Sequence, residues 1–193
     1  MATEHTPQPV KQDKETRKMQ RIVIVGTSGS GKTTLARQLA NLLSIPAVEL
    51  DALHWEPNWT PAQVPVLRER VEAALSSEAW VVDGNYSNVR DLTWSRADTI
   101  IWLDYNLGVI MARLIQRTFS RAFTGEELWS GNRESLRKTL FTKDSILLWA
   151  LYTYPRHKYR YRKLMRQSEY AHLNFVRHRS PEATRRWLVQ ANW

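Results

Sequence analysis

The strongest constraint on the fold is a glycine-rich loop that stands between an apolar run and a helical pattern. The apolar run covers residues 21–25, and leucines recur at helical spacing between residues 33 and 43. The loop between them reads Gly26-Thr27-Ser28-Gly29-Ser30-Gly31-Lys32-Thr33, which fits the pattern G-x-x-x-x-G-K-[ST] at every position. A strand, a loop and a helix in this order predict a phosphate-binding loop, because backbone N–H groups and the positive helix end face the same anion.

The chemistry of this loop predicts what its residues do. Lys32 is expected to reach the β- and γ-phosphates, the Thr33 hydroxyl to ligate Mg²⁺, and Thr34 to meet the α-phosphate. The predicted cofactors are therefore ATP and Mg²⁺. The predicted ATP-binding residues are Gly26, Thr27, Ser28, Gly29, Ser30, Gly31, Lys32, Thr33, Thr34 and, from a later segment, Arg133.

The rest of the chain repeats the alternation of strand and helix, which predicts an α/β fold with a parallel sheet. Residues 1–19 are polar with almost no apolar periodicity, so we expect a disordered tail before one domain of residues 20–193. We expect further strands at 47–50, 80–82, 99–103 and 174–177, and helices at 33–43, 62–75, from 105 through 121, and from 181 onward.

Composition narrows the class of protein. Cysteine is absent, which excludes disulfides and thiolate metal sites and fits a reducing cytoplasm. No apolar run is long enough to span a bilayer, so we expect a protein without membrane contact. The net charge of +9 arises entirely from residues 105–167, which hold 13 Lys and Arg against 4 Asp and Glu. Such a patch suits ATP, a second phosphorylated substrate or nucleic acid, or it is simply a solvated basic face.

Three aspartates end or follow apolar strands, where ligands bind in open α/β sheets. Both Asp83 and Asp104 fit the pattern of a carboxylate near Mg²⁺, and the pattern alone does not choose between them. Each of the three could instead cap the following helix, and for Asp104 we expect that capping role. Asp51 opens an aromatic loop with His54 and Trp55, which suits an acceptor pocket where a carboxylate holds or deprotonates a hydroxyl.

A row of arginines predicts an anion contact on the long helix. Arg113, Arg117 and Arg121 are spaced four residues apart and so share one helix face. Like charges at that spacing repel, and a bound phosphate would offset the cost. Arg117 and Arg121 are therefore the predicted transition-state stabilisers, with Arg133 next. Gly125 and Gly131 lie in the interval that follows, which suggests a lid at about 121–137.

Four motifs together resemble one family. They are Gly26-x4-Gly31-Lys32-Thr33, Leu50-Asp51-Ala-Leu-His-Trp55, Trp80-Val-Val-Asp83-Gly84-Asn85-Tyr86 and Leu128-Trp-Ser-Gly-Asn-Arg133. The chain is similar over about residues 20–190 to the small P-loop proteins described as adenylate-kinase-like, some of which are labelled DNA topology modulation proteins. The Asp-Gly-Asn-Tyr motif is the most specific part of the likeness.

The resemblance implies a three-layer P-loop NTPase fold with a five-stranded parallel sheet flanked by helices, an acceptor region at about 51–76 and a short helical lid. It favours Asp83 over Asp104 near Mg²⁺. The expected substrate-binding residues are Asp51, His54, Trp55, Asp83, Asn85, Tyr86 and Arg90. Adenylate kinases proper carry Asp-Gly-Phe-Pro-Arg at the strand end where Asp83 stands. Here the first arginine is Arg90, so an acceptor phosphate must be held in another way.

The sequence supports two hypotheses about the function. The leading hypothesis is a Mg²⁺-ATP-dependent kinase of a nucleotide or another small acceptor, with Lys32, Asp51, Arg117 and Arg121 as catalytic residues. The alternative is a nucleotide-regulated nucleic-acid-binding protein or an ATPase, suggested by the tyrosines and basic residues that interleave over residues 152–166. The simpler reading of that segment is a basic surface helix with its tyrosines against the core. By position, residues 178–181 are the expected adenine-recognition loop.

Overall fold

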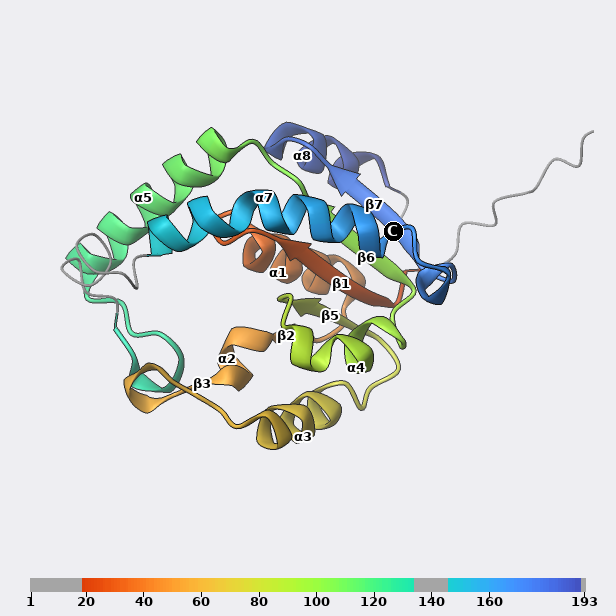
Figure 1. Cartoon of the computed structure of the whole chain (residues 1–193), viewed down its shortest axis with the longest axis horizontal. Coiled ribbons are helices and arrows are strands. Elements are labelled where there is room, and N and C mark those ends of the chain that lie inside the picture. Colours follow the sequence, from red (N-terminus) through yellow and green to blue (C-terminus); the bar gives the residue numbers. More distant parts are fainter. Residues whose placement is uncertain (1–18, 134–145, 192–193) are drawn as a thin grey trace, which may run out of the picture.

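The central element is a parallel sheet of five strands in the order β2-β5-β1-β6-β7 (Figure 1). This computed structural model describes residues 19–133 and 146–191 of the chain. Residues 1–18 of the predicted tail and residues 134–137 of the predicted lid lie outside the described part. The α/β fold and the five-stranded parallel sheet expected from the sequence are confirmed.

The five strands of the sheet and the longer helices follow one another as the sequence pattern predicts, with small shifts at their ends, whereas the two short helices at Leu50–His54 and Arg90–Trp94 and the hairpin of Trp55–Glu56 and Thr60–Pro61 were not predicted. The strands of the sheet are β1 (Arg21–Gly26), β2 (Ala47–Glu49), β5 (Trp80–Asp83), β6 (Thr99–Leu103) and β7 (Asn174–His178). The α-helices are α1 (Lys32–Leu43), α2 (Leu50–His54), α3 (Val64–Ala74), α4 (Arg90–Trp94), α5 (Leu107–Thr124), α7 (Ile146–Leu164) and α8 (Pro181–Gln190). Short 3-10 turns cover η1 (Pro57–Trp59), η2 (Ser87–Val89), η3 (Trp129–Gly131) and η4 (Ser168–Tyr170), and β3 (Trp55–Glu56) and β4 (Thr60–Pro61) form an antiparallel hairpin.

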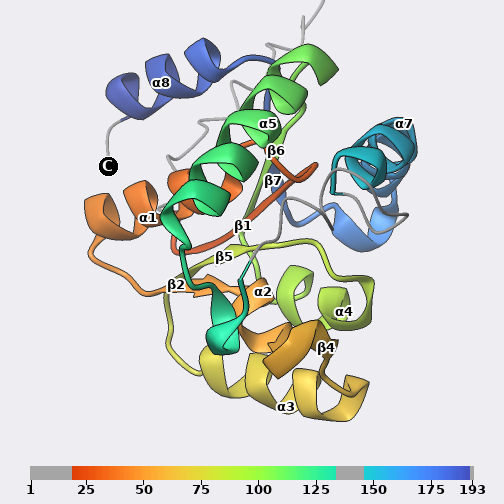
Figure 2. The same ribbon diagram turned by 90° about the vertical axis from the view of Figure 1, so that its left-hand side faces the viewer.

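Helices cover both faces of the sheet, because successive strand residues point to opposite sides. Val23 and Val25 of β1 belong to a core that includes residues of α3, α4 and the end of α7, whereas Ile22 and Ile24 belong to a core with α1 and α5. Figure 2 shows α1, α5 and α8 on one side of the sheet and α7 and α4 on the other. None of the described helices is long and apolar enough to cross a lipid bilayer.

The strand register brings the candidate residues to one edge of the sheet. Ile24 of β1 is paired with Asp83 of β5, and Glu49 of β2 is paired with the same Asp83. Because β5 lies between β1 and β2, the chain following β2 and the glycine loop following β1 flank the end of β5. Asp104 follows β6, on the other side of β1.

The expected role of Asp104 as a helix cap is wrong. Helix α5 is capped by Asn106, whose side chain accepts a hydrogen bond of 2.8 Å from the backbone of Gly108. The carboxylate of Asp104 is 3 % exposed and forms ion pairs with Arg177 and with Lys158, at 3.5 Å for the latter. The Arg177 guanidinium also stacks on Trp102 at 4.5 Å. Asp104 therefore ties β6 to β7 and α7, which a pattern of neighbouring residues does not reveal.

Replacing Asp104 tests this structural role. Asp104→Ala leaves two cations facing a buried site without their counter-charge, so the free energy of unfolding is expected to fall by about 2–3 kcal/mol. Urea denaturation followed by circular dichroism measures the change. Glu182→Ala is the control, because its pair with Arg186 is long and exposed and is expected to contribute little. Equal losses for both variants would contradict the role given to Asp104.

Candidate active site

The glycine loop is held from outside by helix α5. The φ angle of Gly29 is +81°, and a Cβ atom there would lie 2.5 Å from the Cγ of Leu114, so only glycine fits without displacing the helix. The Arg113 guanidinium donates a hydrogen bond of 3.0 Å to the Ser30 carbonyl and stacks on the ring of Tyr105. The loop conformation and the position of α5 are thus mutually dependent.

Thr33 and Asp83 are in direct contact behind the loop. The Thr33 hydroxyl donates a short hydrogen bond to the Asp83 carboxylate, which is 8 % exposed. Burial raises the pKa of Asp83, while the Lys32 charge and the Thr33 hydrogen bond act in the opposite direction. The strand pattern did not distinguish Asp83 from Asp104, and the family resemblance favoured Asp83. The structure puts Asp83 beside Lys32 and Thr33, and Asp104 in an ion-pair cluster.

Asp51 is joined to the chain that follows β5 by a hydrogen bond with Tyr86. The Tyr86 hydroxyl donates a hydrogen bond of 2.7 Å to Oδ1 of Asp51. Burial, followed by the charge of Asp51, raises the pKa of Tyr86, so this hydroxyl keeps its proton. Gly84 lies close to Leu50 of α2, and a Cβ atom at residue 84 would be only 2.8 Å from the Cβ of Leu50. The glycine of the Asp-Gly-Asn-Tyr motif therefore allows the end of β5 to pack directly on α2.

An open pocket of about 1920 Å³ connects these groups. Of the predicted ATP-binding residues, those from Ser28 to Thr34 and Arg133 line it, whereas Gly26 and Thr27 do not. Asp51, Trp55 and Asp83 also line the pocket. The His54 ring packs against Trp55 at 4.7 Å and Tyr86 at 4.5 Å, outside the lining. Asn85, Tyr86 and Arg90 lie outside the lining as well.

The arginine row of α5 faces the same pocket. Arg113, Arg117 and Arg121 all line it, as their spacing predicts for one helix face. Arg121 also forms an ion pair of 3.3 Å with Glu126, and Arg133 forms one of 3.5 Å with Glu127. The row therefore runs from the glycine loop toward the segment that follows α5.

That segment is bound to the β3–β4 hairpin by Asn132, a residue that the sequence analysis gave no role of its own. The Asn132 side chain is buried, accepts a hydrogen bond of 2.8 Å from the Trp59 backbone and donates one of 2.9 Å to the Glu56 carbonyl. Trp59 has a φ of +57°, which is strained for an aromatic residue. The Ser130 hydroxyl adds a bond of 2.7 Å to the Trp55 carbonyl. The described part of the predicted lid is thus joined to the acceptor loop.

Part of the pocket is lined by α8 and by Tyr105, the second residue after β6. Tyr105, Pro181, Thr184, Arg185 and Leu188 line this part. The hydroxyls of Tyr105 and Thr184 are hydrogen-bonded at 2.5 Å. Of the predicted adenine loop at 178–181, only Pro181 lines the pocket, while the ring of His178 is buried against Trp187. Thr184, Arg185 and Leu188 of α8 were not among the residues expected at the site from the sequence.

Helix α7 carries a partly buried histidine, His157, whose ring packs against Tyr161 at 6.0 Å. Burial, followed by the charges of Lys32 and Arg160, lowers the pKa of His157 to about 4. Two of the tyrosines noted in this segment turn inward: Tyr161 is buried, and the Tyr154 hydroxyl donates to the Tyr105 carbonyl at 3.2 Å. Tyr159 remains 73 % exposed. No local sequence motif identifies His157 as a buried, neutral histidine, because the charges that act on it include Lys32, which is distant in the sequence.

Comparison with known proteins agrees with this architecture. Residues 22–104 match the family model described as "ATPase family associated with various cellular activities (AAA)". The structure is similar to a gluconokinase from Sinorhizobium meliloti 1021, with a TM-score of 0.50, 20 % identity and coverage of 88 % of this chain and 90 % of that one. It is also similar to a shikimate kinase from Acinetobacter baumannii in complex with shikimate, with a TM-score of 0.55, 16 % identity and coverage of 90 % of each chain. No curated protein matches the sequence.

These likenesses establish a P-loop NTPase fold of the kind found in small kinases. At 16–20 % identity they identify the fold and not the substrate. The resemblance to small P-loop kinases expected from the sequence is confirmed at this level, and no comparison supports the DNA topology label.

The junction made by Asn132 yields a testable expectation. Asn132→Ala removes the acceptor of the Trp59 N–H, so amide exchange at Trp59 is expected to accelerate at least about tenfold, the equivalent of one hydrogen bond. Hydrogen exchange followed by mass spectrometry or NMR measures this. Asn88→Ala, on the exposed turn before α4, is the control and should leave the Trp59 amide unchanged. If the Trp59 amide exchanges at the same rate in Asn132→Ala, the hairpin keeps its conformation without Asn132.

The pKa of His157 gives a second expectation. The unfolded chain takes up a proton on this histidine near pH 6.5, and the folded chain does so only near pH 4. The unfolded state therefore binds more protons between these values, so the free energy of unfolding falls as the pH falls from 6.5 to 4. His157→Gln should make this decline shallower in urea titrations. The same slope in both proteins would contradict a neutral, buried His157.

Proposed function

We propose that this protein is an ATP-dependent phosphotransferase that acts on a small hydroxylated acceptor. The observation that carries the proposal is the carboxylate of Asp51, which lines the same pocket as Lys32 and is oriented by the Tyr86 hydroxyl. A phosphate-binding loop alone serves many NTPases. A carboxylate held beside it, next to an aromatic loop, is what a hydroxyl acceptor requires.

In the proposed reaction the acceptor hydroxyl donates a hydrogen bond to Asp51. The Tyr86 hydrogen bond occupies Oδ1, and in the described part of the chain Oδ2 makes no hydrogen bond. The hydroxyl oxygen forms a bond to the γ-phosphorus, the bond from that phosphorus to the bridging oxygen breaks, and ADP leaves. The hydroxyl proton passes to Asp51. Lys32 together with Arg117 and Arg121 offsets the negative charge that spreads over the transferred group.

The residues behind the loop fit a magnesium ion. A hydroxyl and a carboxylate are the hard oxygen ligands that Mg²⁺ accepts beside phosphates and water, and Thr33 and Asp83 provide them in contact with each other. When bound, the ion would neutralise phosphate charge. Asp83 and Thr33 would hold it, and Lys32 would keep the phosphates in place next to them.

The aromatic loop is proposed to hold the acceptor. Trp55 and Trp59 line the pocket next to Asp51, with their rings 5.6 Å apart in an edge-to-face arrangement. Because Asn132 joins this loop to the segment that carries Arg133, the acceptor and the ATP phosphates would be enclosed by parts that are bound to each other. Such enclosure would exclude water and limit wasteful hydrolysis of ATP.

The test is ADP formation from Mg²⁺-ATP with a panel of nucleosides, nucleotides, sugars and hydroxy acids. At least one acceptor is expected to raise the rate well above that with water alone. Lys32→Ala should abolish this rate. Asp51→Asn should lower it by about 10²- to 10⁴-fold while ATP affinity changes little, because only proton acceptance is lost.

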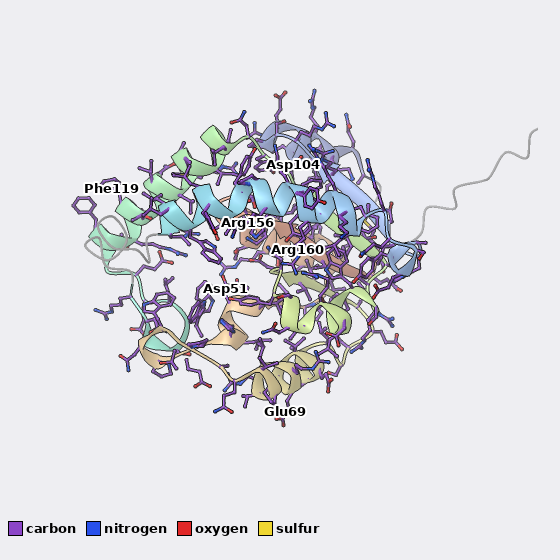
Figure 3. The ribbon with its side chains drawn as sticks, viewed as in Figure 1. Asp51, Glu69, Asp104, Phe119, Arg156 and Arg160 are labelled. Atoms are coloured by element: carbon purple, nitrogen blue, oxygen red, sulfur yellow. The ribbon has the colours of Figure 1, made fainter. Side chains whose placement is uncertain are left out.

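Two results would count against the proposal. If no acceptor accelerates ADP formation, the protein is an ATPase or a nucleotide-dependent binding protein. If Asp51→Asn keeps the full acceptor-stimulated rate, Asp51 is not the base. Glu69→Gln is the matched control, since Glu69 is an exposed carboxylate on α3 away from Asp51 (Figure 3) and its loss should leave the rate unchanged.

A further inference from the structure

The part of the pocket formed by residues 51–61 is largely apolar. The residues of this stretch that line the pocket are Asp51, Trp55, Pro57, Asn58, Trp59 and Pro61. Two indoles and two pyrrolidine rings thus stand beside one amide and one carboxylate. The chain has no Lys or Arg anywhere from residue 51 to residue 67, so the stretch that carries Asp51 brings no positive charge to a ligand.

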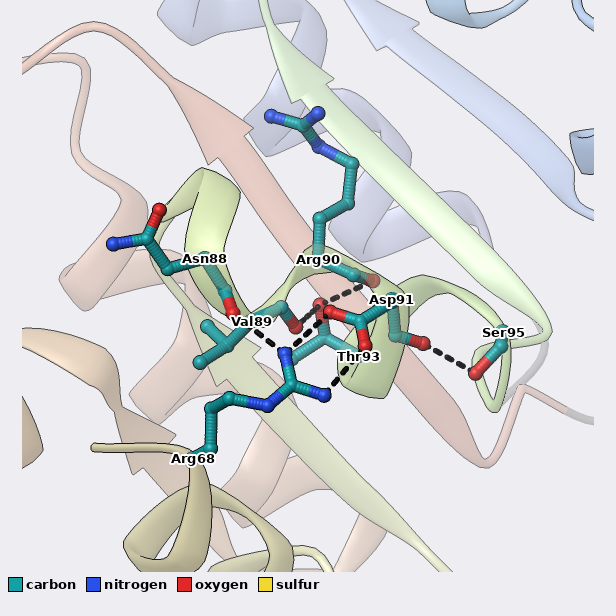
Figure 4. Close-up of polar contacts among 7 residues, drawn as sticks. All are labelled: Arg68, Asn88, Val89, Arg90, Asp91, Thr93 and Ser95. Carbon is teal, nitrogen blue, oxygen red and sulfur yellow. Dashed lines mark hydrogen bonds and ion pairs between the residues drawn. The ribbon is translucent and has the colours of Figure 1, made fainter. Parts of the chain in front are cut away.

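The first basic side chains after this stretch are engaged elsewhere. Arg68 donates to the Asn88 carbonyl at 2.7 Å and to both carboxylate oxygens of Asp91, at 2.9 and 2.6 Å (Figure 4). Arg70 forms an ion pair of 2.9 Å with Glu56. Neither arginine is among the described residues that line the pocket. Both guanidinium groups therefore support the chain around the site and do not face a ligand in it.

Arg90 does not supply a cation to the pocket either. It lies on α4, stacks over the ring of Trp94 at 5.6 Å and is directed away from Arg68 in Figure 4. It is outside the described lining. The sequence required another way of holding an acceptor phosphate, because no arginine follows β5 directly, and Arg90 does not provide it.

The cations that do line the described pocket belong to other parts of it. Most stand on the glycine loop, α5 or α8: Lys32, Arg113, Arg117, Arg121 and Arg185. Arg37 forms an ion pair of 2.8 Å with Glu49. Arg133 has Glu127 beside it at 3.5 Å. An anionic acceptor would therefore approach both Asp51 and the γ-phosphate against their negative charges, and like charges at short distance repel.

The two indoles of this stretch are held in a defined arrangement. The Trp55 ring meets the Trp59 ring at an interplanar angle of 78° and packs against His54 at 4.7 Å. Asn58 and Trp59 are consecutive residues with positive φ, +60° and +57°, and Asn132 bonds the Trp59 backbone. Backbone strain of this kind persists only where the surroundings maintain it, and it is common where ligands bind.

These features decide what an acceptor has to offer. We propose that the acceptor is an uncharged cyclic alcohol, whose ring packs on the indoles of Trp55 and Trp59 while its hydroxyl faces Asp51. A ring face buries apolar surface against an indole and needs no counter-charge. Nucleosides and sugars share this chemistry, and the experiments below distinguish them. The inference rests on the proposed phosphotransfer, because it names the substrate class of the same site.

The first experiment measures acceptor binding without catalysis. The protein is saturated with Mg²⁺ and a non-hydrolysable ATP analogue, and nucleosides, pyranoses and cyclitols are titrated by calorimetry. Matched probes vary one property at a time: adenosine against AMP and glucose against glucuronate for charge, and glucose against sorbitol for the ring. At least one neutral ring is expected to bind about tenfold or more tightly than its charged or open-chain counterpart.

The outcome of this titration decides the inference by itself. If AMP, glucuronate or sorbitol binds as tightly as its neutral cyclic counterpart, or if no neutral ring binds, the inference is overturned whether or not the protein is a kinase.

Variants of Trp55 test the indole contact. Trp55→Phe keeps a ring face and is expected to bind the preferred probe nearly as well as the wild type, whereas Trp55→Leu should weaken binding about tenfold. Trp149→Leu is the control, because Trp149 is exposed on α7 outside the pocket lining. Unchanged affinity in Trp55→Leu would overturn the inference. Should Trp55→Leu fail to fold in urea titrations, the comparison of matched probes on the wild type decides.

The second experiment uses the same matched probes in the ADP assay. The neutral ring is expected to have the highest kcat/KM, and Trp55→Leu should raise its KM about tenfold with a smaller change in kcat, because the contact is with the ring and not with the reacting hydroxyl. The set that responds distinguishes a nucleoside from a sugar. A higher kcat/KM for the anionic member would overturn the inference and leave phosphotransfer standing. Absence of any acceptor effect would refute phosphotransfer, and calorimetry would still decide whether a neutral ring binds.

Discussion

The packing of helix α5 against the glycine loop is the contact on which the rest of the site depends. Leu114 occupies the space that a side chain at residue 29 would need, and Arg113 bonds the loop at the Ser30 carbonyl. This contact sets the rotation of α5 about its axis. Because Arg117 and Arg121 follow Arg113 at one-turn intervals, the same contact directs both toward the pocket. The conformation of the glycine loop and the positions of the arginines therefore depend on the same contact.

The strand order then determines the surroundings of each of the three aspartates. Strand β5 lies between β1 and β2, so Asp83 is next to the glycine loop on one side and next to the chain that carries Asp51 on the other. Asp104 follows β6 on the far side of β1 and is neutralised by Arg177 and Lys158. Three aspartates that look alike along the chain therefore lie in three different electrostatic surroundings.

The features that the sequence predicts well are those carried by neighbouring residues. The glycine loop, the alternation of strands and helices and the one-sided arginine row all depend on short spacings. The fold is confirmed, and the three arginines of the row all line the pocket. The features that it missed join distant segments. Asn132 bonds Glu56 and Trp59 across more than seventy residues. The capping role expected for Asp104 failed for the same reason, since its partners on α7 and β7 are remote in sequence.

The distribution of tryptophans has an optical consequence. Trp80, Trp94 and Trp102 are at most 2 % exposed and lie in the core, whereas Trp55, Trp59 and Trp129 line the pocket. The indole N–H groups of Trp59 and Trp129 lie 3.4 Å from the Arg133 carbonyl and 3.3 Å from the Glu49 carboxylate. The core indoles emit from a dry, constant environment, and the pocket indoles from one that a ligand alters. A ligand in the pocket is therefore expected to change the emission of these three indoles, while the core indoles and Trp149, which is exposed outside the pocket lining, contribute a constant background.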